Sequence, residues 1–283
     1  MRIAVIPNAD KPEAVLCALK ISELLCSKGA QIILPSWISL DDAAELNASQ
    51  FDTYREIFAH CDCAVTVGGD GTIIHSARYA ALSKKPIIGV NLGRLGYVAE
   101  VEPSEIEMLT HLLDGEYITK ERMTLEVTVI HSDGRSESYL AVNDAVISRG
   151  SLSCIIDLDV FVEGEKICNY RADGLLFSTP TGSSAYALSA GGPIIDPGLS
   201  MIELTPVCPH SLTARTVLFA DDTVLSVMCN SPDSSYLTVD GQVSVKLDGS
   251  DTVRVRKSEH KLLMNVIKPK NFYKVAGEKL GTT

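Results

Sequence analysis

The first 118 residues alternate short apolar runs with stretches of helical periodicity, and this alternation constrains the fold more than any other feature of the sequence. In chain order the expected elements are a strand at 3–6, a helix at 11–28, a strand at 31–35, a helix at 50–60, a strand at 63–67, a helix at 73–82, a strand at 87–90 and a helix at about 104–114. Gly29 is placed to end the first helix, and Ser104 with Glu107 form a capping box for the last. Strands that alternate with helices predict an α/β domain with a mainly parallel sheet flanked by helices.

After about residue 119 the periodicity changes from helical to alternating. Leu125, Val127 and Val129 alternate with polar residues before a turn at 132–134, and the run 156–162 alternates again before Gly164. Further short strand-like segments lie at 216–219, 223–229, 236–239 and 242–247. This pattern predicts an antiparallel, β-rich domain. We expect the α/β domain to span 1–118, completed by 257–283, and the β-rich domain to span 119–256.

The strongest local signal is Gly68-Gly69-Asp70-Gly71-Thr72, which lies between a buried strand and a helix. Glycines let a backbone approach a ligand closely and adopt positive φ, and the N-terminus of a helix attracts phosphate. A carboxylate inside such a loop suits metal binding, proton acceptance from an attacking hydroxyl, or both. The alternative is a tight strand-to-helix turn in which Asp70 caps the helix.

Two other segments suggest ligand binding. Residues 91–97, Asn-Leu-Gly-Arg-Leu-Gly-Tyr, directly follow a strand, where open α/β sheets bind ligands, although a structural loop explains them equally well. Residues 171–193 contain Ser178-Thr179-Pro180-Thr181-Gly182-Ser183-Ser184, whose density of hydroxyls suits a polyhydroxylated, phosphate-bearing ligand. Tyr186 is suited to stacking on a flat ring. A plain surface loop is the alternative for this segment.

The sequence suggests alternative roles for three smaller features. Asn143-Asp144 sits between apolar runs, so both side chains need partners, either adenosine hydroxyls or internal backbone groups. Asp240-Gly241-Gln242 has the chemistry of a hairpin turn and is interpreted as structural. His75 lies one helical turn beyond the glycine loop and faces either phosphates or solvent.

Several functional classes are excluded or disfavoured. No G-x-x-x-x-G-K-[ST] or G-x-G-x-x-G pattern occurs, which excludes a P-loop enzyme and disfavours an ordinary dehydrogenase. The net charge of −11 argues against nucleic-acid binding, and it requires anionic ligands to be held by local amides, a few basic side chains and a metal ion. Eight cysteines without a C-x-x-C pair indicate reduced thiols in a cytoplasmic protein. No apolar run is long enough to predict a membrane span.

Taken in order, the motifs GGDGT, NLGRLGY, NDAVISRG, ADGLLFSTPTGSSAYALSAGGP, PHSLTAR and DGQ resemble the NAD kinase family over about residues 1–275. The long Ser/Thr/Gly segment is the most specific of these. GGDG alone is shared with phosphofructokinases and diacylglycerol-type lipid kinases. The resemblance implies a sandwich-like C-terminal domain, and transfer of the γ-phosphoryl group of ATP to the adenosine 2′-hydroxyl of NAD, with a divalent cation, magnesium, as cofactor. It also implies a homodimer or homotetramer.

The resemblance further implies roles for individual residues. Asp70 becomes the proton acceptor, and the phosphate loop comprises Gly68, Gly69, Gly71 and Thr72. The expected NAD contacts are Asp70, Gly71, His75, Asn143, Asp144, Arg171, Asp173, Ser184, Ala185, Tyr186, Ala187, Leu188, Ser189 and Gln242. No metal ligand is assigned to a specific residue.

This chain departs from the family pattern at five positions. His75 replaces an Arg or Lys, Asp144 a Glu, Arg171 a Lys and Ser184 a Thr, and Cys154 stands where a basic residue is common. Two rivals remain: a lipid kinase with the same glycine loop, and a nucleotide sensor without catalysis. Donors other than ATP, NADH as acceptor and feedback by the product are left open by the sequence.

Overall fold

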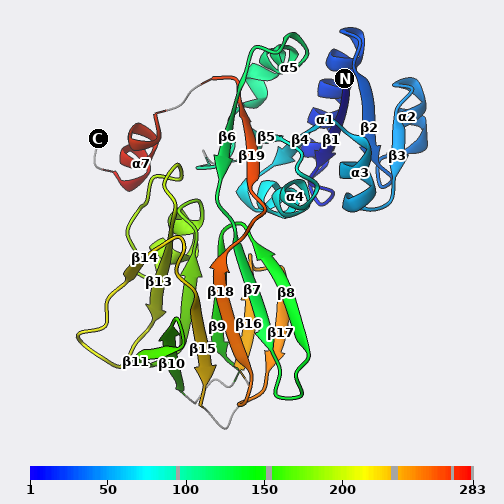
Figure 1. Ribbon diagram of the computed structural model, residues 1–283. Helices are drawn as coiled ribbons and strands as arrows, with labels where there is room; N and C mark the ends of the chain where they lie inside the picture. Colours follow the sequence, from blue (N-terminus) through cyan, green and yellow to red (C-terminus); the bar gives the residue numbers. More distant parts are fainter. Residues whose placement is uncertain (94–95, 151–154, 231–234, 269–270, 282–283) are drawn as a thin grey trace. The chain divides into compact units, whose positions relative to one another are not determined.

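The computed structural model describes residues 1–93, 96–150, 155–230, 235–268 and 271–281. The chain forms two compact units, Met1–Arg122 with His260–Thr283 and Met123–Glu259 (Figure 1). The expected boundaries at 118 and 256 differ from these by a few residues. The difference arises because residues 118–122 form a strand that pairs within the sheet of the first unit.

The first unit is built on one seven-stranded sheet. Its strands are β1 (Arg2–Pro7), β2 (Gln31–Pro35), β3 (Ser49–Phe51), β4 (Cys63–Gly68), β5 (Ile87–Asn91), β6 (Ile118–Arg122) and β19 (Leu262–Val266). They are ordered β3-β2-β1-β4-β5-β19-β6, and all pair in parallel except β6, which is antiparallel to β19. The C-terminal strand β19 thus lies inside the sheet, between β5 and β6.

Helices cover both faces of this sheet. They are α1 (Pro12–Ser27), α2 (Leu40–Glu45), α3 (Tyr54–His60), α4 (Asp70–Ser83), the 3-10 helix η1 (Pro103–Thr110) and α5 (His111–Asp114). A further helix, α7 (Phe272–Leu280), follows β19 in the chain. The apolar stripe of α1, including Ile21 and Leu25, packs on Ile3 and Val5 of one face. On the other face Gly89 of β5 makes room for Ile73 of α4, because a Cβ there would lie 2.5 Å from the Ile73 Cδ1.

Two of the expected helices differ in the structure. The helix expected at 104–114 is a 3-10 helix followed by one α-helical turn, and its capping box is Glu102 with Glu105 rather than Ser104 with Glu107. Pro103 explains the shift, because its fixed φ suits the first helical position and moves the cap to Glu102. The helix expected at 50–60 is shorter, since residues 49–51 pair with β2 as a strand.

The strand order places a topological switch point between β1 and β4. The chain leaves β1 toward β2 and leaves β4 toward β5, so the connections diverge at the carboxyl ends of these two neighbours. Open α/β sheets bind ligands at such a point. The loop at 68–72 begins there, at the carboxyl end of β4.

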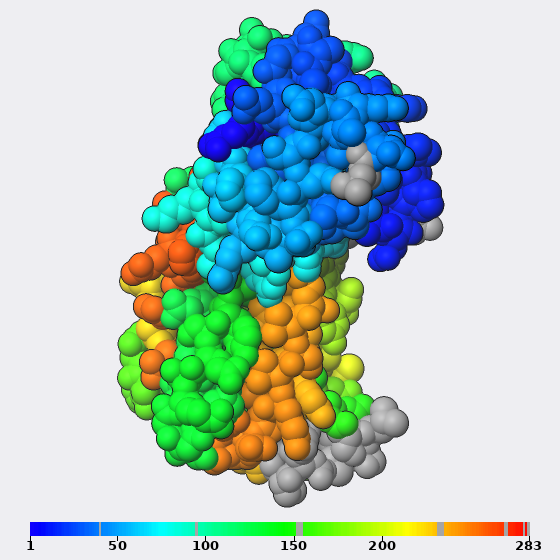
Figure 2. All heavy atoms as spheres, turned by 90° about the vertical axis from the view of Figure 1, so that its right-hand side faces the viewer, coloured from blue at the N-terminus to red at the C-terminus, as the bar shows by residue number. Residues whose placement is uncertain are grey.

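The second unit consists of two six-stranded antiparallel sheets. Its strands are β7 (Leu125–Ile130), β8 (Ser136–Ala141), β9 (Asp144–Arg149), β10 (Ile156–Val162), β11 (Glu165–Ala172), β12 (Gly174–Ser178), β13 (Met201–Val207), β14 (Val217–Ala220), β15 (Leu225–Cys229), β16 (Ser235–Val239), β17 (Val243–Leu247) and β18 (Thr252–Lys257). One sheet has the order β11-β10-β15-β18-β7-β8 and the other β14-β13-β12-β9-β16-β17. The edge strands β8 and β17 lie along the same side of the unit, in green and orange (Figure 2).

Alternate side chains from both sheets form one apolar core. Val127 and Leu158 of the first sheet pack in the same cluster as Phe177, Leu204 and Leu237 of the second. The unit is therefore an antiparallel β-sandwich. The predicted fold class, an α/β domain with a parallel sheet followed by an all-β sandwich, is confirmed.

Candidate functional site

The glycine loop takes its shape from the crossover between β4 and α4. Gly68 ends the strand and α4 begins at Asp70. A Cβ at Gly68 would lie 2.7 Å from the Thr72 hydroxyl, which accepts a hydrogen bond of 3.0 Å from the Asn8 side chain at the end of β1. Contrary to the sequence expectation, none of Gly68, Gly69 and Gly71 has positive φ. Gly68 is required by lack of space, whereas Gly69 and Gly71 leave open space at the helix N-terminus.

The carboxylate of Asp70 lies against the loop that follows β5. Its Oδ2 accepts a hydrogen bond of 2.9 Å from the amide of Tyr97. A Cβ at Gly96 would lie 2.0 Å from Oδ1, so only glycine fits there. Among the described residues Oδ1 is buried and has no hydrogen-bond partner. Asp70 is therefore not a helix cap: one oxygen is fixed by a backbone amide and the other is unpaired. Arg94 and Leu95 of this loop lie outside the described residues.

His75 belongs to an aromatic cluster on α3 and α4. Its ring lies edge-on to Tyr54, with centroids 4.8 Å apart, and 5.7 Å from the ring of Tyr79. The cluster follows from helical spacing, because His75 and Tyr79 are four residues apart on α4. The contact of His75 with NAD stays a prediction.

In the second unit, Asp240 organises the segment that carries Asn143 and Asp144. Its carboxylate accepts hydrogen bonds from the amides of Val142, Asn143 and Asp144, at 2.9, 2.7 and 3.1 Å. Asp240 and Gly241 both have positive φ, as a two-residue hairpin turn requires. The sequence correctly predicts this turn. It does not predict that the Asp240 side chain accepts hydrogen bonds from residues nearly a hundred positions earlier in the chain.

The Ser/Thr/Gly segment wraps around the backbone of Asn143. The Thr179 amide donates to the Asn143 carbonyl at 2.9 Å, and the Thr179 hydroxyl donates to the Val142 carbonyl at 2.7 Å. A Cβ at Gly182 would lie 2.2 Å from the Asn143 carbonyl oxygen. The side chains of Asn143 and Thr181 each keep a buried oxygen, Oδ1 and Oγ1, without a partner among the described residues. The two predicted motifs are thus joined by hydrogen bonds and close packing around the Asn143 backbone.

Asp144 is an acid whose pKa is raised by its surroundings. Its side chain is buried, and burial, followed by the negative charge of Asp240, raises its pKa to about 7. A carboxyl with a pKa near neutrality can donate or accept a hydrogen bond. Functional sites often contain groups perturbed in this way.

The remaining residues expected to contact NAD fall into two groups. The run 184–189 ends in the short helix α6 (Tyr186–Ser189), where Tyr186 is exposed and Ala187 is buried against Val146 and Leu176. Ser183, just before this run, anchors it, because its hydroxyl donates to the Pro180 carbonyl and accepts from the Ile195 amide. Gln242 is exposed beside the Asp240 turn.

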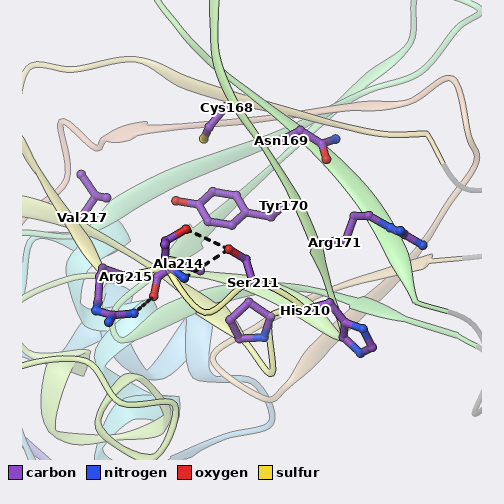
Figure 3. Close-up of a pocket in the computed structure, with 11 residues that line it drawn as sticks. Cys168, Asn169, Tyr170, Arg171, His210, Ser211, Ala214, Arg215 and Val217 are labelled. Carbon is purple, nitrogen blue, oxygen red and sulfur yellow. Dashed lines mark hydrogen bonds between the residues drawn. The ribbon is translucent and has the colours of Figure 1, made fainter.

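Arg171 and Asp173 have different surroundings. Asp173 is held by Arg149, whose Nε and Nη2 lie 3.1 and 3.3 Å from its two carboxylate oxygens. Arg171 lines a pocket of about 490 Å³ on the second unit (Figure 3). The pocket is lined by Cys168, Asn169, Tyr170, Arg171, Pro209, His210, Ser211, Thr213, Ala214, Arg215 and Val217. This lining contains two arginines and a histidine but no carboxylate.

His210 and Arg215 have no predicted role, although both belong to the PHSLTAR motif. Nη1 of Arg215 donates to the carbonyls of Leu212 and Ala214, which fixes the loop. Cys154, one of the departures noted above, lies outside the described residues.

No group of three or more His, Cys, Asp or Glu side chains is placed to hold a metal ion in the described part of the chain. The helices of that same part include none with the length and apolar character needed to cross a membrane.

Comparisons with known proteins agree in both units. Residues 3–117 match the family described as ATP-NAD kinase N-terminal domain, and residues 142–268 match the ATP-NAD kinase C-terminal domain. The NAD kinase of Geobacter sulfurreducens is 37% identical over 281 residues, which cover 99% of this chain and 98% of that protein. The NAD kinase of Solibacter usitatus is 42% identical over 278 residues, covering 97% and 94%.

Two solved structures have a similar fold. Yeast NADH kinase, crystallised with NADH, superposes with a TM-score of 0.88 at 25% identity, over 99% of this chain and 87% of that one. An NAD kinase from Archaeoglobus fulgidus, in complex with ATP, gives a TM-score of 0.75 at 24% identity over the full length of both chains.

Proposed function

This chain belongs to the NAD kinase family, whose members phosphorylate NAD to NADP with ATP, and we propose that it does so with Asp70 as the proton acceptor. The observation that carries this assignment is the buried Oδ1 of Asp70 at the N-terminus of α4, for which the described residues provide no hydrogen-bond partner. An acceptor-only oxygen without a donor is where a substrate hydroxyl would bind.

The proposed reaction is an in-line displacement. The adenosine 2′-hydroxyl of NAD attacks the γ-phosphorus of ATP, and its proton passes to Oδ1 of Asp70. The new bond joins the 2′-oxygen to phosphorus, while the bond to the β,γ-bridging oxygen breaks and ADP leaves. The Tyr97 amide fixes the other oxygen of Asp70 and so holds the carboxylate in one orientation. Most of the acceleration comes from positioning and charge neutralisation.

The glycine loop is proposed to hold donor phosphates. Gly69 and Gly71 place no side chain near the first amides of α4, which lack partners within the helix. These amides and the helix dipole favour phosphate oxygens. The unpaired Oδ1 of Asp70 also fits a magnesium ion held mainly by the donor's own phosphates. When bound, that ion supplies charge neutralisation of the triphosphate.

The second unit is proposed to recognise NAD. Asn143 Oδ1 offers an acceptor to a ribose hydroxyl, and the near-neutral carboxyl of Asp144 offers a second hydrogen bond. Arg171, the run 184–189 and Gln242 complete the proposed contacts. The pocket beside Arg171 is lined by Arg215 and by Arg171, which also pairs with Asp157 at 3.5 Å, and it suits an anionic group such as the pyrophosphate of NAD.

One coupled assay tests the proposed function. We expect NADP to form from NAD, ATP and magnesium, detected with an NADP-specific dehydrogenase. Parallel reactions replace ATP with polyphosphate or other triphosphates, and NAD with NADH or diacylglycerol. Binding of NAD without turnover would favour the sensor, and phosphorylated lipid without NADP would favour the lipid kinase. The family further suggests a cytoplasmic homodimer or homotetramer. Light scattering on the purified protein would measure its oligomeric state.

A further inference from the structure

One face of the C-terminal helix α7 lies against Tyr97. Phe272, Ala276 and Lys279 are spaced so that they share this face, at positions i, i+4 and i+7. The ring of Phe272 lies 6.3 Å from the ring of Tyr97, and Nζ of Lys279 lies 3.9 Å from the centroid of the same ring. Ala276 is buried. Asn271 caps the helix by accepting hydrogen bonds from two of its first amides.

This contact brings a positive charge near Asp70. Tyr97, whose ring Lys279 contacts, also orients Asp70, because the Tyr97 amide donates a hydrogen bond to the Asp70 carboxylate. Burial lowers the pKa of Lys279, and the negative charge of Asp70 acts on it in the opposite direction. No hydrogen-bond or ion-pair partner of the Lys279 ammonium lies in the described part of the chain. The N–H groups that do not face the Tyr97 ring therefore remain available to a ligand.

Phosphoryl transfer requires cationic groups beside the phosphates, and the glycine loop of this chain contains no lysine or arginine. The net charge of −11 gives no general attraction for a triphosphate. Lys279 supplies a local cation next to the proton acceptor.

We propose that Lys279 contacts phosphate oxygens of the nucleotide donor beside Asp70, so that the C-terminal helix supplies a donor-binding residue. This inference rests on the proposed function, because it takes the donor to bind at the Asp70 loop. A ligand contact and a purely structural contact with Tyr97 make different predictions. If Lys279 contacts phosphate, its replacement changes the affinity for the triphosphate and the salt dependence of that affinity. If Lys279 only packs on Tyr97, the effect of its replacement does not depend on the charge of the donor.

The test compares wild type with Lys279→Gln, Lys279→Arg and the control Lys274→Gln. Lys274 is on the same helix, 75% exposed and paired with Glu278 at 4.0 Å, so its loss removes the same charge away from Tyr97. Calorimetry with magnesium and a non-hydrolysable ATP analogue measures binding without turnover. We expect Lys279→Gln to raise the dissociation constant about tenfold and to weaken its salt dependence. Lys279→Arg and Lys274→Gln should stay within about twofold of wild type.

Steady-state kinetics on the same variants complete the test. Lys279→Gln should raise KM for ATP while KM for NAD stays within about twofold. Equal analogue affinity in Lys279→Gln and Lys274→Gln would overturn the inference, as would a change confined to KM for NAD. If wild type makes no NADP, the proposed function fails, but the binding measurement still decides the role of Lys279.

Discussion

At the scale of single residues, the chemistry depends on which oxygens are left unpaired. Asp70→Asn keeps the shape of the side chain and its acceptor for the Tyr97 amide, but removes the proton acceptor. We expect kcat to fall by about 10²–10⁴-fold. NAD affinity, measured by calorimetry, should change little. Turnover within threefold of wild type would show that another group takes the proton.

Asn143 provides a second residue-scale test. Asn143→Ala removes the buried Oδ1 proposed to bind a ribose hydroxyl, while the backbone carbonyl that holds Thr179 remains. We expect NAD binding to weaken by about 1–3 kcal/mol. Asn230→Ala is the matched control, because it removes a surface hydrogen bond to Asp159 in the same unit. Equal NAD affinity in the two variants would remove Asn143 from the site.

At the scale of elements, strand β13 carries a buried acid below the hydroxyl-rich segment. Glu203 is fully buried, its Oε1 accepts a hydrogen bond of 2.9 Å from Thr205, and its Oε2 has no partner among the described residues. Gly192 lies directly above it, since a Cβ there would be 2.0 Å from Oε1. Burial raises the pKa of Glu203 from 4.5 to about 7, against a smaller lowering by Thr205.

This acid should make the stability of the protein depend on pH. Below pH 4.5 Glu203 is protonated in both folded and unfolded chains. Between pH 4.5 and about 7 the unfolded chain releases the proton while the folded chain keeps it, so stability falls as pH rises. The loss is complete above pH 7 and amounts to at most about 3 kcal/mol.

Glu203→Gln should remove that loss. Urea titrations at pH 5 to 8 measure the unfolding free energy of both proteins. We expect the variant to become increasingly more stable than wild type as pH rises. Asp144 also has a raised pKa, but it is present in both proteins and cancels in the difference. Glu165→Gln, at an exposed position on β11, should follow wild type at every pH. If the curves of unfolding free energy against pH for Glu203→Gln and wild type are parallel, ionisation of Glu203 does not destabilise the folded protein.

At the scale of the whole molecule, the chain ends by completing the domain in which it begins. Strand β19 lies between β5 and β6, and β6 is the edge strand that pairs with β19. A chain ending at residue 259 lacks β19, so we expect the first unit to unfold while the second, Met123–Glu259, stays folded. Limited proteolysis with mass spectrometry would detect this as selective cleavage within residues 1–122.

A chain ending at residue 268 is the matched control. It keeps β19 and lacks α7 with Lys279, so both units should resist the protease. It should also lose affinity for the ATP analogue to the same extent as Lys279→Gln. Equal protection of the first unit in both truncated chains would mean that β19 is dispensable for its fold.

The sequence by itself determined the features that local periodicity and turn chemistry encode. The β-α-β alternation predicts the parallel sheet, alternating apolar residues predict the sandwich, and a glycine loop after a buried strand places Asp70 at the start of a helix. Each of these signals spans a few neighbouring residues, which is the range over which side-chain spacing reflects backbone conformation. A helix was predicted at about 104–114, but its 3-10 form and the cap at Glu102, ahead of Pro103, were not.

Only the tertiary structure decided which distant residues meet. The Asp240 carboxylate binds the amides of Val142 to Asp144, Glu203 lies under Gly192, and Lys279 lies over Tyr97. In isolation each of these reads as a turn residue, a strand residue or a surface lysine. Their roles depend on burial and on partners far away in the chain, and those are set by how sheets and helices pack rather than by the residues beside them.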